Sequence, residues 1–414
     1  MTPEVNERIE QIRHGIVPEG YKKTKAGVVP EDWTEYAIGD CLERVERPVA
    51  VQPDEVYTQI GIRSHGKGLF YKEPVTGESL GNKAVFWIEP NCFVLNIVFA
   101  WEQAIGKTTQ NEVGMIGSHR FPMYRPVDDK VDIDYLIANL MTKRGKDILE
   151  AASPGGAGRN RTLGQERFMR SKLVLPPIAE QRYIADILTA QDKVIELKES
   201  MLIEKQRQKK YLMQQLLTGK KRLPGFDGEW MYVRANQIFR NVTDKKHNGT
   251  LEVLSATQDR GIIPRSLVDI DIKYAEESLT GYKKVAKGNF VISLRSFQGG
   301  IEYSEYSGIV SPAYTVLSSI YPIEDNYYKQ FFKSTDYINR LNIAVYGIRD
   351  GKQISYNDFG RIRIPYPPLD EQKAIAAVLE TADKEIEILK RNIEQEKQKK
   401  KALMQLLLTG IVRV

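Results

Sequence analysis

The sequence predicts a mixed α/β protein of α+β character, built from two copies of one unit. Each unit would have an α/β block followed by a long helix, and the two helices would pair antiparallel as a coiled coil with pseudo-two-fold symmetry. Two observations predict this fold. The segment from Pro177 to Gly219 recurs without a gap from Pro368 to Gly410, and apolar residues inside it follow a heptad spacing. A gap-free internal match of this length indicates a duplicated unit.

Each copy of the repeated segment predicts one helix. A proline pair opens the copy, Pro176-Pro177 or Pro367-Pro368, and proline both ends a strand and starts a helix. Gly219 and Gly410 close the two copies, at the position that a left-handed residue takes after a helix. An uninterrupted helix over about 179–217 would be roughly 58 Å long.

The heptad spacing places an apolar seam on each predicted helix, and such a seam is buried only against another helix. A glutamate–glutamine pair precedes the seam and a short apolar group follows it. We expect these residues to hold the helices together or to face a partner. In the first copy they are Glu180, Gln181, Ile184, Leu188, Ile195, Leu212 and Leu216, and in the second they are Glu371, Gln372, Ile375, Leu379, Ile386, Leu403 and Leu407.

The segments between the helices are two blocks with short β-like runs separated by glycine and polar turns. The runs are Ala84–Ile88, Cys92–Phe99, Phe290–Leu294 and Tyr314–Ile320. Weaker matches, such as Trp33 with Trp230, extend the duplication into the blocks. The expected division is an N-terminal segment of unassigned role (1–25), a first block (26–175), a first helix (176–222), a second block (223–366) and a second helix (367–414).

Composition excludes several classes of protein. A length of 414 residues allows two or three domains, and a net charge of +6 is compatible with nucleic-acid binding without requiring it. The two cysteines, Cys41 and Cys92, have no CxxC spacing, and the four histidines are scattered, which argues against a disulfide framework and a common zinc site. No apolar run has the length of a membrane span, and the first residues lack a signal-peptide core. We expect a cytoplasmic protein.

Three sets of motifs carry a resemblance to a known family. The helices open with PPIAEQ and PPLDEQ, and they close with LMQQLLTG and LMQLLLTG. The blocks open with VPEDWTEYAIGD and FDGEWMYVRANQ. With these motifs the chain, from about residue 26 to its end, resembles the DNA-specificity subunit of type I restriction–modification systems. Residues 1–23 are a departure from the family pattern.

The resemblance implies a subunit without catalytic activity or a cofactor of its own. Each block would be a target-recognition domain that reads one half of a split, asymmetric site in double-stranded DNA, and the helix pair would set the spacer between the halves. The implied protein partners are two methyltransferase subunits, which use S-adenosylmethionine to methylate adenine at N6, and motor–nuclease subunits where these are present. No membrane partner is implied.

DNA contacts require Arg or Lys for phosphates and Arg, Lys, Asn, Gln, Ser or Thr for base edges. Polar loops in both blocks offer such side chains, although a solvated loop is an equally simple interpretation for any one of them. The candidates in the first block are Arg63, Ser64, His65, Lys67, Lys107, Thr109, Gln110, Arg159 and Arg161. Those in the second block, matched to them in order along the chain, are Thr257, Gln258, Arg260, Arg295, Gln298, Arg349, Lys352 and Gln353.

Two alternatives stay open from the residues alone. The basic runs at 205–210 and 397–401 fit a solvated helix face or contact with spacer phosphates, which salt dependence would separate. The whole chain could also be a coiled-coil adaptor whose blocks bind proteins, and such an adaptor would show no preferred DNA sequence. A stand-alone methyltransferase is disfavoured, because the proline pairs lack the polar residue of an amino-methyltransferase motif.

Overall fold

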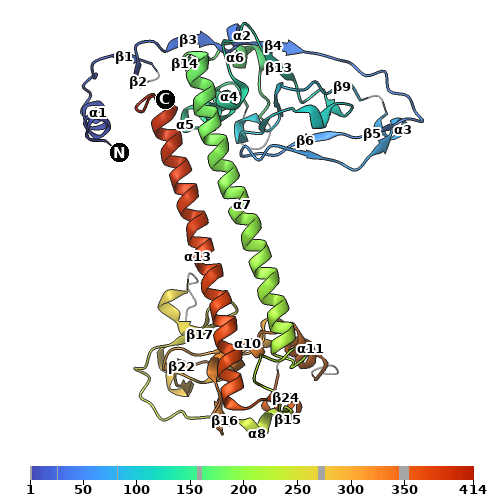
Figure 1. Ribbon diagram of the computed structural model, residues 1–414, viewed down its shortest axis with the longest axis vertical. Helices are drawn as coiled ribbons and strands as arrows, with labels where there is room; N and C mark the ends of the chain where they lie inside the picture. The colour runs from blue at the N-terminus through green and yellow to red at the C-terminus, as the bar shows by residue number, and fades with distance from the viewer. Residues whose placement is uncertain (1, 26, 82, 156–160, 269–275, 345–353) are drawn as a thin grey trace. The chain divides into compact units, whose positions relative to one another are not determined.

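The computed structural model of the protein describes residues 2–25, 27–81, 83–155, 161–268, 276–344 and 354–414 (Figure 1). The chain forms two compact units. The first unit contains Met1–Leu197 and Ile393–Val414, and the second contains Lys198–Asn392. Each unit therefore contains one block, the start of one long helix and the end of the other. The boundary between the two units falls inside both long helices. The division into separate blocks and helices, which the sequence predicts, therefore stays a prediction.

The two predicted helices are confirmed as α7 (Ile178–Leu216) and α13 (Leu369–Leu407), each 39 residues long (Figure 1). Gly219 and Gly410 follow them with φ of 70° and 71°, the left-handed conformation that glycine adopts without strain.

Within each unit, the start of one long helix packs antiparallel on the end of the other. In the first unit Ile184 and Leu188 share a core with Leu407. Further along the pair, Asp192 of α7 contacts Lys400 of α13, so the residue numbers rise on one helix as they fall on the other. In the second unit Leu216 shares a core with Ile375. The seam residues are thus buried in both units.

A four-stranded antiparallel sheet lies at the centre of each unit, and the strand order is the same in both. The order in the first unit is β4-β13-β10-β11, with β4 at Leu42–Val45, β10 at Phe93–Leu95, β11 at Ile105–Lys107 and β13 at Met123–Pro126. The order in the second unit is β16-β23-β20-β21, with β16 at Phe239–Val242, β20 at Phe290–Ile292, β21 at Glu302–Tyr303 and β23 at Thr315–Ser319. The equal order supports the duplication of the blocks.

Three two-stranded sheets also correspond between the units. In the first unit they join β3 (Thr34–Ala37) to β14 (Lys172–Leu175), β6 (Ile60–Ile62) to β7 (Leu69–Tyr71) and β9 (Val85–Trp87) to β12 (Ile116–Ser118). In the second unit they join β15 (Met231–Arg234) to β24 (Arg363–Tyr366), β17 (Leu254–Thr257) to β18 (Gly261–Pro264) and β19 (Lys283–Val285) to β22 (Gly308–Val310).

Short helices lie between the strands of both units. Those of the first unit are α2 (Ile38–Cys41), α3 (Gly77–Leu80), η1 (Ala100–Glu102), η2 (Gln110–Glu112), α4 (Ile133–Leu140), α5 (Lys143–Ala151) and α6 (Gln165–Arg170). Those of the second are α8 (Ala235–Ile238), η3 (Arg265–Leu267), η4 (Glu276–Gly281), α9 (Ser296–Gly299), α10 (Asp325–Phe331), α11 (Thr335–Ala344) and α12 (Tyr356–Arg361). The first unit also has the small pair β5 (Val56–Tyr57) and β8 (Val75–Thr76).

The N-terminal segment, whose role the sequence left open, lies against the end of α13 (Figure 1). It consists of α1 (Pro3–Arg13) and a hairpin of β1 (Tyr21–Thr24) and β2 (Gly27–Pro30). The Tyr21 hydroxyl donates a hydrogen bond to the Gly410 carbonyl over 2.7 Å, and the Arg8 guanidinium donates one to the Ile411 carbonyl. The segment is therefore packed as part of the first unit.

The predicted β-like runs contain strands, but one is too long. The run Cys92–Phe99 forms a strand only over Phe93–Leu95. Its end has a local cause, because the Asn96 side chain accepts a hydrogen bond from the Val98 N–H over 3.1 Å and turns the chain. The other three runs contain β9, β20 and β23 close to their expected bounds.

Candidate functional site

The tip of the β6–β7 hairpin carries four of the predicted DNA-contact residues, Arg63, Ser64, His65 and Lys67. The turn is tight, with positive φ at His65 (61°) and Gly66 (63°). The Arg63 guanidinium donates to the Leu69 carbonyl over 2.9 Å and lies 5.0 Å from the centre of the Phe70 ring. It is therefore held against its own hairpin, with its side chain still exposed.

Backbone hydrogen bonds attach this hairpin tip to η1. The His65 N–H donates to the Glu102 carbonyl over 2.7 Å, and the Gly66 N–H donates to the Gln103 carbonyl over 2.9 Å. Ser64 donates its hydroxyl proton to the Glu102 carboxylate. On the same short helix, the Trp101 ring centre lies 5.4 Å from the Arg161 guanidinium. The structure thus brings two of the predicted sets, the hairpin tip and Arg161, to one segment.

Lys107 and Thr109 have other partners in the first unit. The Lys107 ammonium is 2.6 Å from Asp134 of α4. Thr109 caps η2, because its hydroxyl oxygen accepts a hydrogen bond from the Asn111 N–H over 3.2 Å, and its own N–H donates to the Glu112 carboxylate over 2.6 Å. Gln110 follows on η2 with an exposed side chain. These contacts give Lys107 and Thr109 structural roles, and their contact with DNA stays a prediction.

The β17–β18 hairpin of the second unit places Thr257, Gln258 and Arg260 at its tip. Thr257 donates its hydroxyl proton to the Gly261 carbonyl over 2.9 Å and accepts from the Arg260 N–H over 3.1 Å. The Arg260 guanidinium donates to the Leu267 carbonyl over 3.1 Å, as Arg63 does to the carbonyl of Leu69. Gln258 and Arg260 are exposed. The same hairpin thus carries different polar side chains in the two units.

Arg295 and Gln298 lie at the α9 turn, which follows β20. This turn is adjacent to the hairpin tip of the second unit, because the Lys333 ammonium donates to the Gln258 carbonyl over 3.1 Å and to the Gly299 carbonyl over 2.9 Å. Sequence reasoning missed Lys333, which is a single lysine between two helices and belongs to no pattern. The predicted residues Arg159, Arg349, Lys352 and Gln353 lie outside the described residues.

The strand order corrects one match between the blocks. The sequence comparison paired Lys107–Gln110 with Arg295–Gln298 in order along the chain. In the structure α9 follows β20 as η1 follows β10, so the counterpart of the Arg295 turn is the η1 segment. Lys107 of β11 faces Phe93, whereas Tyr303 of β21 faces Phe290. Tyr303 is therefore the counterpart of Lys107, and its hydroxyl contacts Asp325 as Lys107 contacts Asp134.

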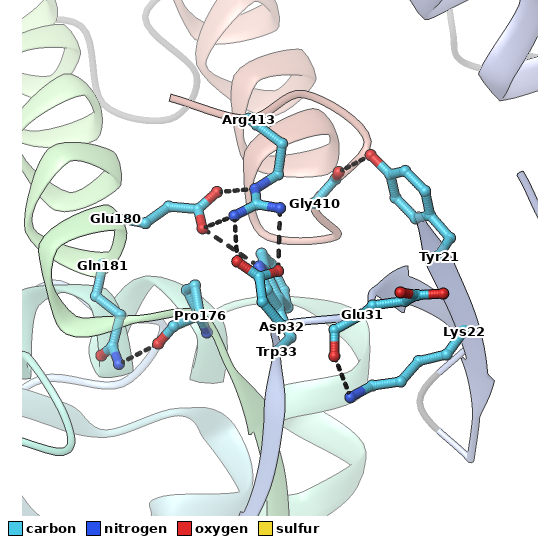
Figure 2. Close-up of polar contacts among 10 residues, drawn as sticks. All are labelled: Tyr21, Lys22, Glu31, Asp32, Trp33, Pro176, Glu180, Gln181, Gly410 and Arg413. Carbon is cyan, nitrogen blue, oxygen red and sulfur yellow. Dashed lines mark hydrogen bonds and ion pairs between the residues drawn. The ribbon is translucent and has the colours of Figure 1, made fainter. Parts of the chain in front are cut away.

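A second group of repeated residues lies where the long helices meet the blocks. In the first unit, Glu180 accepts a hydrogen bond from the Trp33 indole over 3.3 Å and two from Arg413 over 2.6 and 2.8 Å (Figure 2). Arg413 also donates to both oxygens of Asp32 over 3.0 and 2.7 Å. These carboxylates raise the pKa of Arg413 above its ordinary value. We call this group of four residues the first joint.

The second unit repeats the arrangement. Glu371 accepts a hydrogen bond from the Trp230 indole over 2.8 Å and two from Arg222 over 2.5 and 2.6 Å. Arg222 also donates to the Gly228 carbonyl over 2.7 Å. The hydrogen bond with the Glu371 carboxylate raises the pKa of the Arg222 guanidinium. We call Trp230, Glu371 and Arg222 the second joint. Sequence reasoning missed both arginines, although each lies three residues after the glycine that closes its repeat.

The glutamines next to the joint glutamates fasten each helix to its own block. Gln181 accepts from the Asp132 N–H over 3.0 Å and donates to the Pro176 carbonyl over 2.9 Å. Gln372 accepts from the Glu324 N–H over 2.9 Å and donates to the Pro367 carbonyl over 2.9 Å. The Glu-Gln pairs therefore make intramolecular contacts in both units.

The seam residues are buried in both units, as are the apolar residues that follow the seam, except that Leu212 and Leu403 are partly buried. The buried members are Ile184, Leu188, Ile195, Leu216, Ile375, Leu379, Ile386 and Leu407. Several lysines of the basic runs form ion pairs across the helices, including Lys209 with Asp383 and Lys400 with Asp192, both at 2.6 Å. Lys209 and Lys400 are thus paired with the neighbouring helix, so a solvated helix face does not fully describe the basic runs.

The part of the chain that the structure describes contains neither a metal site nor a membrane-spanning helix. Among those residues, no three His, Cys, Asp or Glu side chains are arranged to hold a metal ion. No helix there is both long and apolar enough to cross a membrane.

Known proteins resemble this chain over nearly all of its length. The sequence model of the type I restriction modification DNA specificity domain matches residues 30–205 and 228–397. A sequence from Methanocaldococcus jannaschii named as the specificity subunit of the type I restriction enzyme MjaVIII is 24% identical, over 96% of each chain. A second sequence from that organism, named for the type I restriction enzyme MjaX, is 25% identical over 96% of this chain and 97% of its own.

Solved structures share the fold at lower sequence identity. The HsdS subunit from Thermoanaerobacter tengcongensis has a TM-score of 0.54 at 20% identity, and the alignment covers 93% of this chain and 98% of that one. A chain from a study of complex assembly in the type I R-M system has a TM-score of 0.60 at 19% identity, with 93% and 99% covered. The family match occupies most of the sequence in two copies, and the chain therefore belongs to the family of type I restriction–modification specificity subunits.

Proposed function

We propose that this chain is the non-catalytic, sequence-specific DNA-binding subunit of a type I restriction–modification complex. Each block would read one half of a bipartite, asymmetric site in duplex DNA. The chain would dock N6-adenine methyltransferase subunits, two of them by the family pattern, and motor–nuclease subunits in complexes that cleave DNA. S-adenosylmethionine would be bound by the methyltransferase subunits.

One observation carries the proposal. The two units have the same sheet order and the same hairpin next to a short helical turn, but the side chains at the hairpin tips differ. The first tip has Arg63, His65 and Lys67, and the second has Gln258 and Arg260. A constant scaffold that carries two different polar surfaces is suited to two different half-sites.

The chemistry of the tips supports contact with duplex DNA. Arginine and lysine recognise guanine or phosphate, and glutamine forms a bidentate pair with adenine. The arginine of each tip is fixed by a hydrogen bond to a nearby backbone carbonyl, Arg63 to Leu69 of β7 and Arg260 to Leu267 of η3, the short helix that follows its hairpin. A side chain that is positioned before binding loses less conformational entropy when it binds.

The long helices support the spacer role in the same proposal. At 39 residues and about 1.5 Å per residue, each is roughly 58 Å long. Successive major grooves on one face of B-DNA are about 34–36 Å apart, so a helix of this length can span the distance between two half-sites.

The test is to express the chain with its methyltransferase subunit in cells that lack adenine methylation and to map N6-methyladenine by single-molecule sequencing. We expect one split motif, methylated on both strands and absent without this chain. We expect the double variant Arg63→Ala, Lys67→Ala to relax one half of the motif. The double variant Gln258→Ala, Arg260→Ala should relax the other half. Each lost bidentate base contact reduces discrimination by about 1–3 kcal/mol.

A matched control is Arg170→Ala, which removes an exposed arginine that pairs with its neighbour Glu166 on α6. This variant should leave both half-sites strict. A complex that assembles and methylates without any sequence motif would overturn the proposal in favour of a protein-binding adaptor.

A further inference from the structure

Lys333 joins three segments of the second unit through one ammonium group. It lies in the short link between α10 and α11. Its ammonium donates to the Gln258 carbonyl at the hairpin tip, to the Gly299 carbonyl at the end of α9 and to the Glu302 carboxylate at the start of β21. An ammonium has three protons, so these three acceptors use all of its donors.

The ion pair with Glu302 is largely withdrawn from water. The Glu302 side chain is 2% exposed and that of Lys333 is 26% exposed. Burial raises the pKa of Glu302, and the nearby Lys333 charge opposes that rise. The second carboxylate oxygen of Glu302 is buried and has no hydrogen-bond partner among the described residues. Removing the ammonium would therefore leave a buried carboxylate without its charge partner, which is costly.

The first unit makes the corresponding connection without a lysine. There the hairpin tip is held to η1 by backbone hydrogen bonds from His65 and Gly66. Gln103, which follows η1, is in turn fixed by a hydrogen bond from its amide to the Leu140 carbonyl over 2.9 Å. The same two segments are thus connected by the main chain in one unit and by a side-chain amine in the other.

We propose that Lys333 is the positioning residue of the DNA-contact surface in the second block. By holding the hairpin tip of Gln258 and Arg260 to the α9 turn of Arg295 and Gln298, it makes base selectivity in the second half-site depend on one amine. Selectivity in the first half-site is independent of any such amine. The inference rests on the proposed function, because it concerns how that surface is kept in register with the DNA.

The geometry predicts that loss of Lys333 lowers base selectivity more than DNA affinity. Base discrimination requires side chains held within about 0.5 Å of the productive position. Without Lys333, two acceptor carbonyls lose their shared donor, and the tip and the turn can move relative to each other. Phosphate attraction tolerates such movement better than bidentate base contacts do, so selectivity should fall more than affinity.

The experiment uses the intact complex of this chain with its methyltransferase subunit and the variant Lys333→Met. Methylation mapping should show about a tenfold loss of discrimination at one or more positions of the half-site that Gln258→Ala with Arg260→Ala also relaxes. The first half-site should stay as strict as in the wild type. Lys333→Arg, which keeps the charge, should restore part of the selectivity.

Lys329→Met is the matched control. Lys329 lies four residues earlier on α10 and pairs at the surface with Glu305, so this variant removes the same charge without touching the hairpin tip. It should leave both half-sites unchanged. If Lys333→Met does not assemble, Glu302→Gln is the second variant, and it should relax the same half-site to a smaller extent because an amide oxygen still accepts from the lysine.

The possible failures are distinguishable. Equal relaxation of both half-sites, together with a lower melting temperature, would show that Lys333 acts only on stability and would overturn the inference. Unchanged selectivity in Lys333→Met, with a split motif in the wild type, would also overturn it while leaving the proposed function in place. A wild-type complex without any split motif would contradict the proposed function itself.

Discussion

The two joints use the same three side-chain types but differ in how the chain reaches them. In the second joint, Arg222 and Trp230 belong to one short stretch of chain, and a single carboxylate, Glu371, receives the arginine. In the first joint, Arg413 and Trp33 are far apart in the sequence, and Asp32 supplies a second carboxylate beside Glu180. In the same unit, Tyr21 also donates a hydrogen bond to the Gly410 carbonyl, outside the joint itself.

The difference shows that ionic contacts can replace chain connectivity in a repeated fold. In the second joint, the short segment between Arg222 and Trp230 gives the two side chains a high effective concentration for each other. The single ion pair of Arg222 with Glu371 is therefore enough to hold the joint together. Groups that no short linker connects need more contacts for the same effect. The first joint accordingly has more polar contacts than the second, although its arginine is more exposed, at 40% against 24%.

The largest effect should follow from Arg222→Ala in the second joint. Glu371 is completely buried and, among the residues that the structure describes, would keep the Trp230 indole as its one donor. Removal of one partner of a buried pair typically costs about 3–5 kcal/mol. We expect a loss of about 3 kcal/mol in the free energy of unfolding, measured by urea denaturation followed by circular dichroism. The neighbouring Lys221→Ala should change the stability little, because Lys221 has no part in the joint.

Arg413→Ala should have a smaller effect, confined to the first unit. Glu180 is 5% exposed, but water reaches Arg413 and Asp32 and partly compensates for the lost pair. We expect a loss of about 2 kcal/mol. The chain offers a local probe of this change, because its two cysteines, Cys41 and Cys92, are both buried in the first unit.

Burial raises the pKa of both thiols to about 11, so neither reacts readily in the folded protein. The folded pKa is higher than that of an unfolded chain, so this contribution to stability is present below about pH 9 and is lost as the pH rises toward 11. Labelling at about pH 8 therefore avoids this loss. Arg413→Ala should label about 30-fold faster than wild type, whereas Arg222→Ala should label at the wild-type rate. Equal acceleration in both variants would show that the joints do not stabilise their units separately.

The stability of the two joints should depend differently on salt concentration. The Arg413–Asp32 pair is partly exposed, whereas Glu371 is completely buried, and salt screens exposed charges more than buried ones. Raising the salt concentration should speed thiol labelling of the wild-type protein and should have less effect on Arg413→Ala, which has already lost the screened pair. The same salt dependence in both proteins would contradict a contribution of this pair to the stability of the first unit.

The smallest effect should come from the tyrosine that contacts the end of α13. Tyr21→Phe removes the hydrogen bond to Gly410 and should cost about 1 kcal/mol. Its matched comparison is Tyr232→Phe, because the exposed Tyr232 hydroxyl donates to the Thr218 carbonyl at the end of α7 over 3.2 Å. That bond is open to water and should contribute less. A larger loss for Tyr232→Phe, measured by the same denaturation, would reverse the comparison of the two helix ends.

Much of the scaffold could be predicted because it depends on periodic, local signals. The heptad positions Ile184, Leu188 and Ile195 are buried, since apolar spacing decides which face of a helix is covered. Gly219 and Gly410 adopt positive φ, as a glycine after a helix does. Local signals were weaker for strand ends, and the run from Cys92 was overextended because the turn made by the Asn96 side chain went unrecognised.

Contacts between residues far apart in the sequence could not be predicted in the same way. Nothing periodic links Arg413 to Glu180 or Lys333 to Gln258. The match of Lys107 with Arg295 also failed, because polar residues in loops carry no register, whereas the strand order makes Tyr303 the counterpart of Lys107. The position of a loop residue is defined only when the strands on either side of it are paired.

The sequence by itself determined that the chain is a duplicated unit with two heptad helices and two α/β blocks, because repetition and apolar periodicity are properties of the linear order. Only the tertiary structure decided which charged groups close the joints and which amine holds the second hairpin tip. These pairings depend on distances of a few ångströms between segments far apart in the chain, where burial makes an ion pair strong and its loss costly.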